Sequence, residues 1–345
     1  MNNILQTIAA CLAAGFAGQA SGEDDLNSLL DPISPEISKW ASVCVVGGDA
    51  NTPTFKWHHY QDSESAVNFW PASTIKLYVV LAALEQLNEL AMPFESIVAF
   101  ERREEGEWLL DSSRAMREMI SEVFRHSSNT DYTLLLRMVG LDRINTHFLV
   151  SERGFPHSAL MRGYVRPRPY LYAQTEPQRI TVQSQDGKRK VFEHIWSGRS
   201  YSKERGAVAL HASNSVLSPK SGNCTSTGEL AECLRRIMFH EHLPRKDQYK
   251  LTGEQLSFIR EGGKGLHGLR TATGIVAETA TDIFPKAKFY HKGGWISTYS
   301  LDLACVDDRT DSSKLYIVAV ATATGDTEPI KEMSRRIARW VREND

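Results

Sequence analysis

The chain has 345 residues, of which 41% are hydrophobic and 24% are charged, and its formal net charge is −2. This composition is ordinary for a globular protein with a sizeable core, and the length allows one large domain or two. A nearly balanced charge gives no overall electrostatic reason to expect nucleic acid or an acidic membrane surface as a partner.

The first 20 residues differ from the rest of the chain. Residues 4–17 are largely apolar, no lysine or arginine precedes Lys39, and small residues stand at Gly18 and Ala20. Such a pattern suits cleavage by a signal peptidase, although the usual positive charges at its start are missing. We therefore expect residues 1–20 to be a signal peptide and the protein to be periplasmic or secreted.

The mature chain, residues 21–345, is expected to fold as a single domain. Lipidation at Cys11, which follows a short lipobox-like sequence, stays open as an alternative to cleavage. No other stretch reaches the roughly 20 apolar residues that a membrane span needs.

Strand-like and helical patterns follow one another in blocks. A short docking helix within 21–38 precedes two strands at 40–48 and 54–60, and a helix from Ser73 to Leu90 is apolar nearly all round. Two or three helices are expected within 111–150 and another at 226–240, followed by strands at 287–295, 297–306 and 314–322 and an amphipathic helix at 329–341. We predict an α+β fold in which the first and last strands complete one antiparallel sheet and the helices pack around it.

Residues 162–205 form a basic, proline-marked insertion. Residues 179–184 alternate in polarity, a turn signal follows at 185–187, and 188–192 is basic and apolar, which predicts a β-hairpin. This insertion is either a solvated surface or a wall of a ligand cleft.

The cysteines do not indicate a function. None of the five forms a C-x-x-C pair or has the spacing of metal ligands. Cys44 and Cys305 lie in strand-like runs and are expected in the core, whereas a disulfide between Cys224 and Cys233 stays open. We expect no metal and no cofactor.

The most informative segment is Pro71–Lys76, which places Ser73 and Lys76 three residues apart at the start of the buried helix. On a helix these positions share a face, with Cβ atoms roughly 5–6 Å apart. A lysine that is desolvated among apolar neighbours can accept the proton of a serine and so activate it as a nucleophile.

Two further motifs follow in order. Ser127 and Asn129 stand two residues apart before a leucine-rich helix, where a hydroxyl can relay a proton and an amide can hold a substrate. Lys292, Gly293 and Gly294 lie in a strand-like run before Trp295. Glycines in a strand allow close approach of a ligand, and the lysine offers a cation.

With these three motifs the chain resembles the class A β-lactamase-like family of the serine β-lactamase and penicillin-binding protein superfamily, whose elements are S-x-x-K, S-x-N and K-[TS]-G. The resemblance covers roughly residues 40–345. It implies a three-layer α/β/α sandwich, with a five-stranded antiparallel sheet and an all-helical subdomain at about 73–285.

The resemblance also implies a role for each motif residue. Ser73 would form an acyl-enzyme, Lys76 would accept its proton and Ser127 would pass a proton to the leaving nitrogen. The substrate would be held by the remaining motif residues, namely Asn129, Lys292, Gly293, Gly294 and Trp295. The N–H groups of Ser73 and Trp295 would form an oxyanion hole.

The sequence departs from this family in two places. The loop glutamate that activates the deacylating water is not found, since the corresponding region 161–167 offers no carboxylate. Four acids further along could replace it only if the insertion folds over the site: Glu176, Asp186, Glu193 and Glu204. Gly293 also lacks a hydroxyl that helps to bind the substrate carboxylate, for which Ser297 or Thr298 could compensate.

The expected function is hydrolysis of a β-lactam amide through an acyl-enzyme on Ser73, with slow deacylation. The alternatives are a D-alanyl-D-alanine carboxypeptidase or an esterase of the same superfamily, or a non-catalytic penicillin-binding module. The expected partner is a small β-lactam or peptidoglycan-like acyl compound, and the protein is expected to be a monomer.

Overall fold

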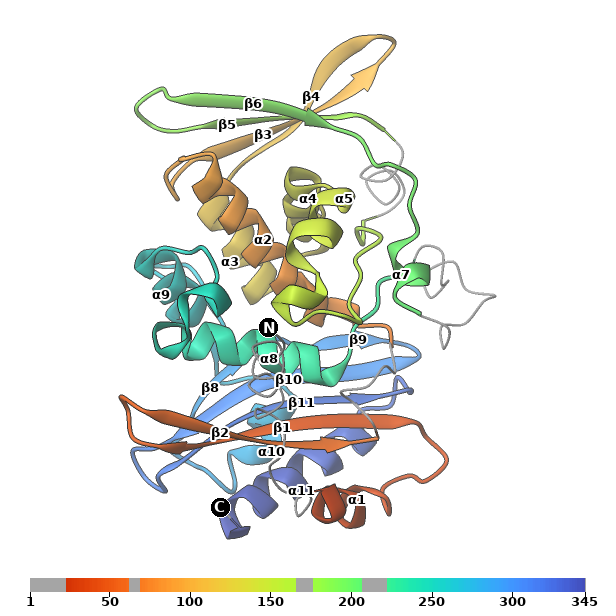
Figure 1. Cartoon of the computed structure of the whole chain (residues 1–345), viewed down its shortest axis with the longest axis vertical. Helices are drawn as coiled ribbons and strands as arrows, with labels where there is room; N and C mark the ends of the chain where they lie inside the picture. Colours follow the sequence, from red (N-terminus) through yellow and green to blue (C-terminus); the bar gives the residue numbers. More distant parts are fainter. Residues whose placement is uncertain (1–22, 62–68, 166–175, 207–221, 345) are drawn as a thin grey trace, which may run out of the picture.

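A computed structural model describes residues 23–61, 69–165, 176–206 and 222–344. The molecule is elongated, with one sheet near each end of its long axis and helices between them (Figure 1). The predicted signal peptide lies outside the described residues.

The larger sheet, which we call the lower sheet, joins the two ends of the chain. Its strands are β1 (Lys39–Gly48), β2 (Pro53–Tyr60), β7 (Arg270–Thr271), β8 (Lys288–His291), β9 (Gly294–Ile296), β10 (Tyr299–Asp308) and β11 (Lys314–Thr322). Their spatial order is β2-β1-β11-β10-β8-β7, with β9 paired to β10. The predicted antiparallel sheet of N- and C-terminal strands is confirmed. It is seven-stranded rather than five-stranded, because β7 adds an edge and the strand expected at 287–295 is divided into β8 and β9.

The lower sheet is covered on both faces. Along β11, Val318 and Val320 pack in one apolar cluster with Ile337, whereas Ile317 and Ala319 pack in the other. One face is covered by α1 (Glu23–Leu30), α10 (Ile275–Ala280) and α11 (Glu328–Asn344), and the other by α8 (Thr227–Met238). Burial on two faces explains why the central strands are continuously apolar, and it confirms the three-layer arrangement.

The helical part lies beyond α8 (Figure 1). Its helices are α2 (Lys76–Glu89), α3 (Met116–Arg125), α4 (Asn129–Val139), α5 (Leu141–Arg143), α7 (Tyr201–Glu204) and α9 (Gly253–Glu261), with short turns η1 (Ala72–Ile75), η2 (Ile144–Phe148), η3 (Ser151–Arg153), η4 (His240–His242) and η5 (Arg245–Asp247). Every residue of α2 from Lys76 to Leu87 is buried, as its apolar sequence predicts.

The structure corrects the prediction of an all-helical subdomain. An upper sheet of order β4-β3-β5-β6 covers the far end of the helices, and its strands are β3 (Ile97–Glu104), β4 (Glu107–Ala115), β5 (Gln178–Gln183) and β6 (Arg189–His194). Residues 111–115, expected in a helix, therefore belong to β4. The sequence did not indicate this strand because β4 is largely exposed, so its residues do not alternate between a buried apolar face and a polar face.

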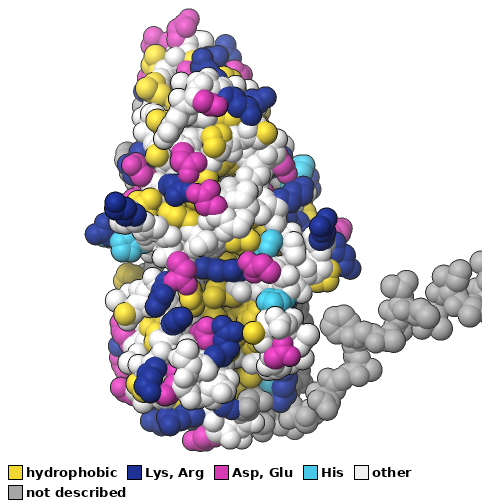
Figure 2. Space-filling model, turned by 90° about the vertical axis from the view of Figure 1, so that its left-hand side faces the viewer, with side chains coloured by type: hydrophobic (Ala, Val, Ile, Leu, Met, Phe, Trp, Pro, Cys, Tyr) yellow, Lys and Arg dark blue, Asp and Glu magenta, His cyan; other side chains and the backbone are white. Residues whose placement is uncertain are grey.

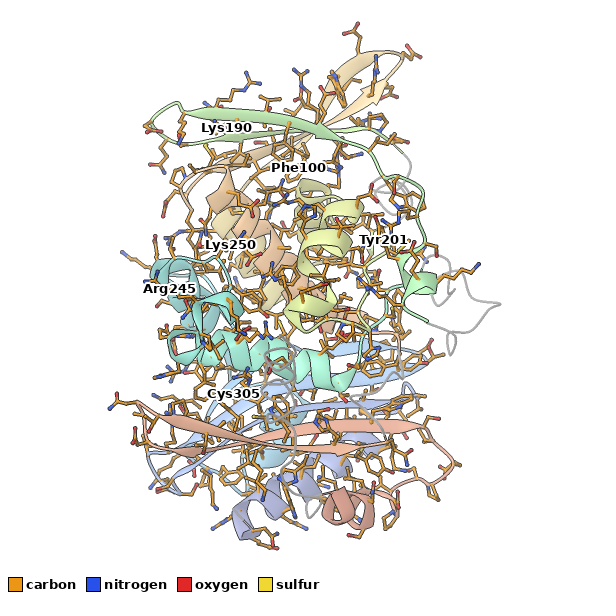
Figure 3. All side chains as sticks on the ribbon, viewed as in Figure 1. Phe100, Lys190, Tyr201, Arg245, Lys250 and Cys305 are labelled. Carbon is orange, nitrogen blue, oxygen red and sulfur yellow. The ribbon has the colours of Figure 1, made fainter. Side chains whose placement is uncertain are left out.

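The predicted hairpin of the basic insertion is confirmed as β5 and β6, and β5 pairs with β3. Lys190 on β6 and Cys305 on β10 mark the upper and lower sheets in Figure 3. Because β5 pairs with β3, the hairpin completes the upper sheet.

Acidic and basic side chains are interspersed over the face that Figure 2 shows.

The four described cysteines, Cys44, Cys224, Cys233 and Cys305, are free and buried. The open question of a bond between Cys224 and Cys233 is thereby answered in favour of two thiols. Within the described ranges no helix is both long and apolar enough to cross a bilayer.

One acid in α8 is buried against a loop of the helical part. Glu229 is only 6% exposed and accepts hydrogen bonds from the backbone N–H of His157 at 2.6 Å and from the Ser158 hydroxyl. Burial raises the pKa of Glu229 from 4.5 to about 7. The folded state therefore binds this proton more tightly than the unfolded chain does.

This shift predicts that Glu229 makes the free energy of unfolding fall as pH rises from about 4.5 to about 7. The change is about 3 kcal/mol, at 1.36 kcal/mol for each pKa unit. In Glu229→Gln, thermal or urea unfolding followed against pH should lose this component. Glu232, whose pKa is lowered by Arg235 and Arg236, is the matched control, since Glu232→Gln should lose a component of opposite sign. An unchanged pH slope in Glu229→Gln would contradict the shift.

Candidate active site

The predicted nucleophile lies in the turn that leads into α2. Ser73 belongs to η1, and the Thr74 hydroxyl closes this turn by donating to the Pro71 carbonyl at 2.6 Å. Ala72, directly before Ser73, has a φ of +44°. A residue with a Cβ is strained there by about 1–3 kcal/mol, and such strain persists only where the surroundings impose it.

The second motif lies between α3 and α4. The Ser128 side chain caps α4 by accepting the N–H of Asp131 at 3.2 Å, so Asn129 becomes the first residue of the helix. Ser127, just before the cap, has a φ of +50°. The cap therefore presents the side chains of Ser127 and Asn129 towards α2.

The Lys76 amine is fully buried and faces this motif. Its Nζ donates to Asn129 Oδ1 at 2.6 Å and to the Ser127 carbonyl, and it lies 3.2 Å from Ser127 Oγ. Burial, reinforced by repulsion from Lys292, lowers the pKa of Lys76 to about 6. At neutral pH the amine is mostly neutral, and after it has donated to two carbonyl oxygens its lone pair can accept a proton.

The second lysine reaches the same hydroxyl from the lower sheet. Lys292 Nζ donates to Ser127 Oγ and to the Gly293 carbonyl, both at 2.9 Å. Burial lowers the pKa of Lys292 to about 8, while nearby Asp302 acts in the opposite direction. The Ser127 hydroxyl thus lies between two amines of different basicity.

A close approach of β9 to η1 brings the third motif beside Ser73. A Cβ on Gly294 would lie 2.8 Å from the Ser73 nitrogen and 3.0 Å from the Cβ of Ala72. Only glycine fits at this contact. Trp295 follows with its side chain 61% exposed and its indole N–H donating to the Gly325 carbonyl at 2.8 Å.

A cavity of about 400 Å³ opens at this junction. Its lining residues are Ser73, Ser127, Gly274, Ile275, His291, Gly293, Gly294, Trp295, Leu301, Asp302 and Thr327. Five of the eight predicted site residues line it. Of the other three, Lys76 and Lys292 each contact the Ser127 hydroxyl, and Asn129 binds the Lys76 amine. The structure therefore brings all eight together.

A second cavity, of about 340 Å³, lies at the far ends of β1 and β10 and holds none of the predicted residues. Its arginines are already paired, Arg260 with Glu241 and Arg309 with Asp307, each at 2.8 Å. We therefore place the candidate site at the first cavity.

Tyr164 occupies the region where the sequence lacks a carboxylate. Its hydroxyl donates to the Ala72 carbonyl at 2.9 Å and accepts from Asn223 Nδ2 at 2.9 Å. Burial raises the pKa of Tyr164 far above its ordinary value, so the phenol stays protonated. Sequence reasoning did not identify Asn223, because a lone asparagine far along the chain carries no signal.

The four acids considered as substitutes do not line the cavity. Glu176 precedes β5, Asp186 accepts from Ser184 in the hairpin turn, and Glu193 lies 3.7 Å from Arg179 on the upper sheet. Glu204 of α7 is paired with Arg199 at 2.8 Å. These positions contradict the idea that the described part of the insertion carries such an acid over the site.

Asp302 is the only carboxylate among the described residues that line the cavity. Its Oδ1 lies 2.8 Å from His291 Nδ1, and its Oδ2 accepts the N–H of Val276 at 2.8 Å. Ser297 and Thr298, considered as replacements for the hydroxyl missing at Gly293, form the turn between β9 and β10 and do not line the cavity. The side-chain atoms nearest to a Cβ placed on Gly293 belong instead to Asp302 and His291, each at 3.4 Å.

Comparisons with known proteins agree with this geometry. The model of the beta-lactamase enzyme family matches residues 54–344. A comparison with curated proteins gave no match.

Several solved structures share the fold. A beta-lactamase from Sphaerobacter thermophilus is 12% identical with a TM-score of 0.54, over 92% of this chain and 96% of that one. A class A beta-lactamase from Bacteroides cellulosilyticus is also 12% identical, with a TM-score of 0.54 over 93% and 97%. PBP-A is 15% identical with a TM-score of 0.55 over 92% and 97%. A mutant of PBP-A, solved as an acyl-enzyme complex with penicillin G, is 17% identical with a TM-score of 0.53 over 92% and 94%.

Because the family match spans most of the chain and the motif residues converge on one cavity, we conclude that the chain belongs to the beta-lactamase enzyme family.

Proposed function

We propose that Ser73 is the nucleophile of an acyl-transfer reaction. The observation that carries the proposal is the chain of hydrogen bonds from Lys76 through Ser127 to Lys292, beside Ser73 in one cavity. Ser73 Oγ bonds to the acyl carbon while Lys76 Nζ takes its proton. The carbon–nitrogen bond then breaks, Ser127 gives its proton to the departing nitrogen, and Lys76 returns a proton to Ser127.

The negative charge that develops on the acyl oxygen is proposed to be bound by two backbone N–H groups, those of Ser73 and Trp295. The contact of Gly294 with the Ser73 nitrogen supports this role, because it brings the start of β9 against η1. Donors held in place before the reaction stabilise the transition state, and one such donor contributes about 10²–10³ in rate.

The proposed acyl donor is a β-lactam. PBP-A, which shares the fold, has been solved in a mutant form as an acyl-enzyme with penicillin G. A β-lactam carries a carboxylate, for which the Lys292 ammonium is the proposed partner. Asn129, a further proposed substrate contact, is exposed, and its Oδ1 accepts a hydrogen bond from Lys76 Nζ.

We further propose that the acyl-enzyme is hydrolysed slowly. Activation of the deacylating water needs a base near Ser73, and the side chain that lies against Ala72 is the protonated phenol of Tyr164. This observation also favours a second candidate function, a penicillin-binding peptidase of the D-alanyl-D-alanine type. An esterase or a non-catalytic penicillin-binding module stays an alternative.

Acylation is tested directly by incubating the protein with a fluorescent penicillin. Ser73→Ala should abolish covalent labelling, because it removes the hydroxyl that is proposed to attack the acyl carbon. Ser297→Ala, in the exposed turn next to the site, should label as the parent protein does. Undiminished labelling of Ser73→Ala would refute the proposed nucleophile.

The two lysines predict a bell-shaped dependence of acylation on pH. The rate should rise through about pH 6 as Lys76 becomes neutral and should fall above about pH 8 as Lys292 loses its charge. Stopped-flow acylation from pH 5 to 10 measures both limbs. Lys292→Arg, which stays charged, should move the upper limb to higher pH and leave the lower limb in place. A flat profile below pH 7 would argue against Lys76 as the proton acceptor.

The protonated Tyr164 at the place of a loop carboxylate predicts a burst when the protein is mixed with nitrocefin. One equivalent should be cleaved rapidly, followed by turnover at least about tenfold slower. Intact-mass spectrometry should then show the acyl adduct, and a parallel incubation with a D-Ala-D-Ala peptide distinguishes the peptidase. Rapid steady turnover without a burst would show that another group activates water.

A further inference from the structure

Ala72 is held from three sides in a conformation that its side chain disfavours. Its carbonyl accepts the Tyr164 hydroxyl at 2.9 Å, and the preceding Pro71 carbonyl is bound by Thr74. On the third side Gly294 leaves no space, since a Cβ there would come within 3.0 Å of the Ala72 Cβ. With a φ of +44°, this residue would relax if one restraint were removed, and Ser73 would move with it.

The Tyr164 hydroxyl is itself fixed. It accepts a hydrogen bond from Asn223 Nδ2 at 2.9 Å, and Asn223 Oδ1 accepts the N–H groups of Met161 and Arg162 at 2.6 and 3.0 Å. The N–H of Tyr164 donates to the Thr133 hydroxyl at 3.2 Å. Because Asn223 supplies the donor, the phenol proton is directed to the Ala72 carbonyl.

Tyr132 provides an internal comparison. Its ring lies 5.7 Å from Lys76 Nζ and that of Tyr164 lies 5.8 Å away, and the two rings are 4.8 Å apart. The hydroxyl of Tyr132, however, donates to the Arg162 carbonyl at 2.8 Å. The two tyrosines therefore surround the lysine alike, and only the hydroxyl of Tyr164 reaches the turn that carries Ser73.

We propose that Tyr164 is a positioning residue, whose hydroxyl holds Ala72 in its strained conformation and thereby sets Ser73 against β9. The inference rests on the proposed function of Ser73 and explains how the site is prepared for acylation before a substrate binds. Displacement of the Ser73 nitrogen would separate it from the N–H of Trp295. This change would lower the rate constant of acylation more than it would weaken substrate binding.

The test compares Tyr164→Phe with Tyr132→Phe, which each remove one oxygen and keep the ring. Acylation by a chromogenic β-lactam is measured over a range of concentrations to obtain the maximal rate constant and the half-saturating concentration. Tyr164→Phe should lower the rate constant by about tenfold to a hundredfold, with half-saturation changed by no more than about twofold. The midpoint near pH 6 should stay in place, since both rings still surround Lys76. Tyr132→Phe should change the rate constant by no more than about twofold.

Ala72→Gly supplies the decisive second step. Glycine adopts a positive φ without strain, so the double variant Ala72→Gly with Tyr164→Phe should regain most of the lost rate constant. Equal effects of the two Tyr→Phe variants, a loss confined to half-saturation, or no recovery by glycine would each overturn the proposal.

Thermal unfolding of the parent, Ala72→Gly, Tyr164→Phe and the double variant separates this inference from the proposed function. Ala72→Gly should raise the midpoint more in the parent, where Ala72 is strained, than in the Tyr164→Phe background, where Ala72 has already relaxed, whether or not the protein reacts with a β-lactam. If the parent protein forms no adduct, the proposed function fails while this cycle still decides whether Tyr164 restrains Ala72. Additive midpoints would refute the restraint.

Discussion

The site depends on the burial of two lysine amines around one serine hydroxyl. Removing an ammonium from water disfavours its charge, and a second cation nearby increases the effect. Lys76, enclosed by α2, α4 and the rings of Tyr132 and Tyr164, therefore becomes a base, whereas Lys292 keeps more of its charge beside Asp302. Their different basicities give Ser127 one neighbour that accepts a proton and one that holds its position.

This arrangement requires the lower sheet and the helical part to meet closely. Ser73 and Lys76 come from η1 and α2, Ser127 and Asn129 from the junction of α3 and α4, and Lys292 from the end of β8. Gly294 allows β9 to lie against η1, and the Ser128 cap aims the junction at α2. The strain at Ala72 and Ser127 lies at this same contact, as is expected where neighbouring elements impose a geometry that the local chain disfavours.

Much of the molecule could be predicted because its signals are local. Largely apolar runs identified β1, β10, β11 and α2, most of whose residues are buried. The upper sheet was only half predicted. The hairpin of β5 and β6 has a turn signal, but β3 and β4 are stabilised by pairing with distant strands, and the exposed face of β4 leaves no clear alternation.

The order and chemistry of the three motifs could be predicted from the sequence, because each is a short run whose residue types and spacing already imply a shared helix face, a junction before a helix or a strand. The sequence also showed that no glutamate follows the second motif in the region where the family carries one. The tertiary contacts were needed to show that five of the eight residues line one cavity and that hydrogen bonds join the other three to them. They were also needed to show that the candidate acids of the insertion lie elsewhere and that Tyr164 binds the Ala72 carbonyl. The pKa shifts of the two lysines also could not be predicted from the sequence, since desolvation and repulsion depend on what packs around an amine rather than on its neighbours in the chain.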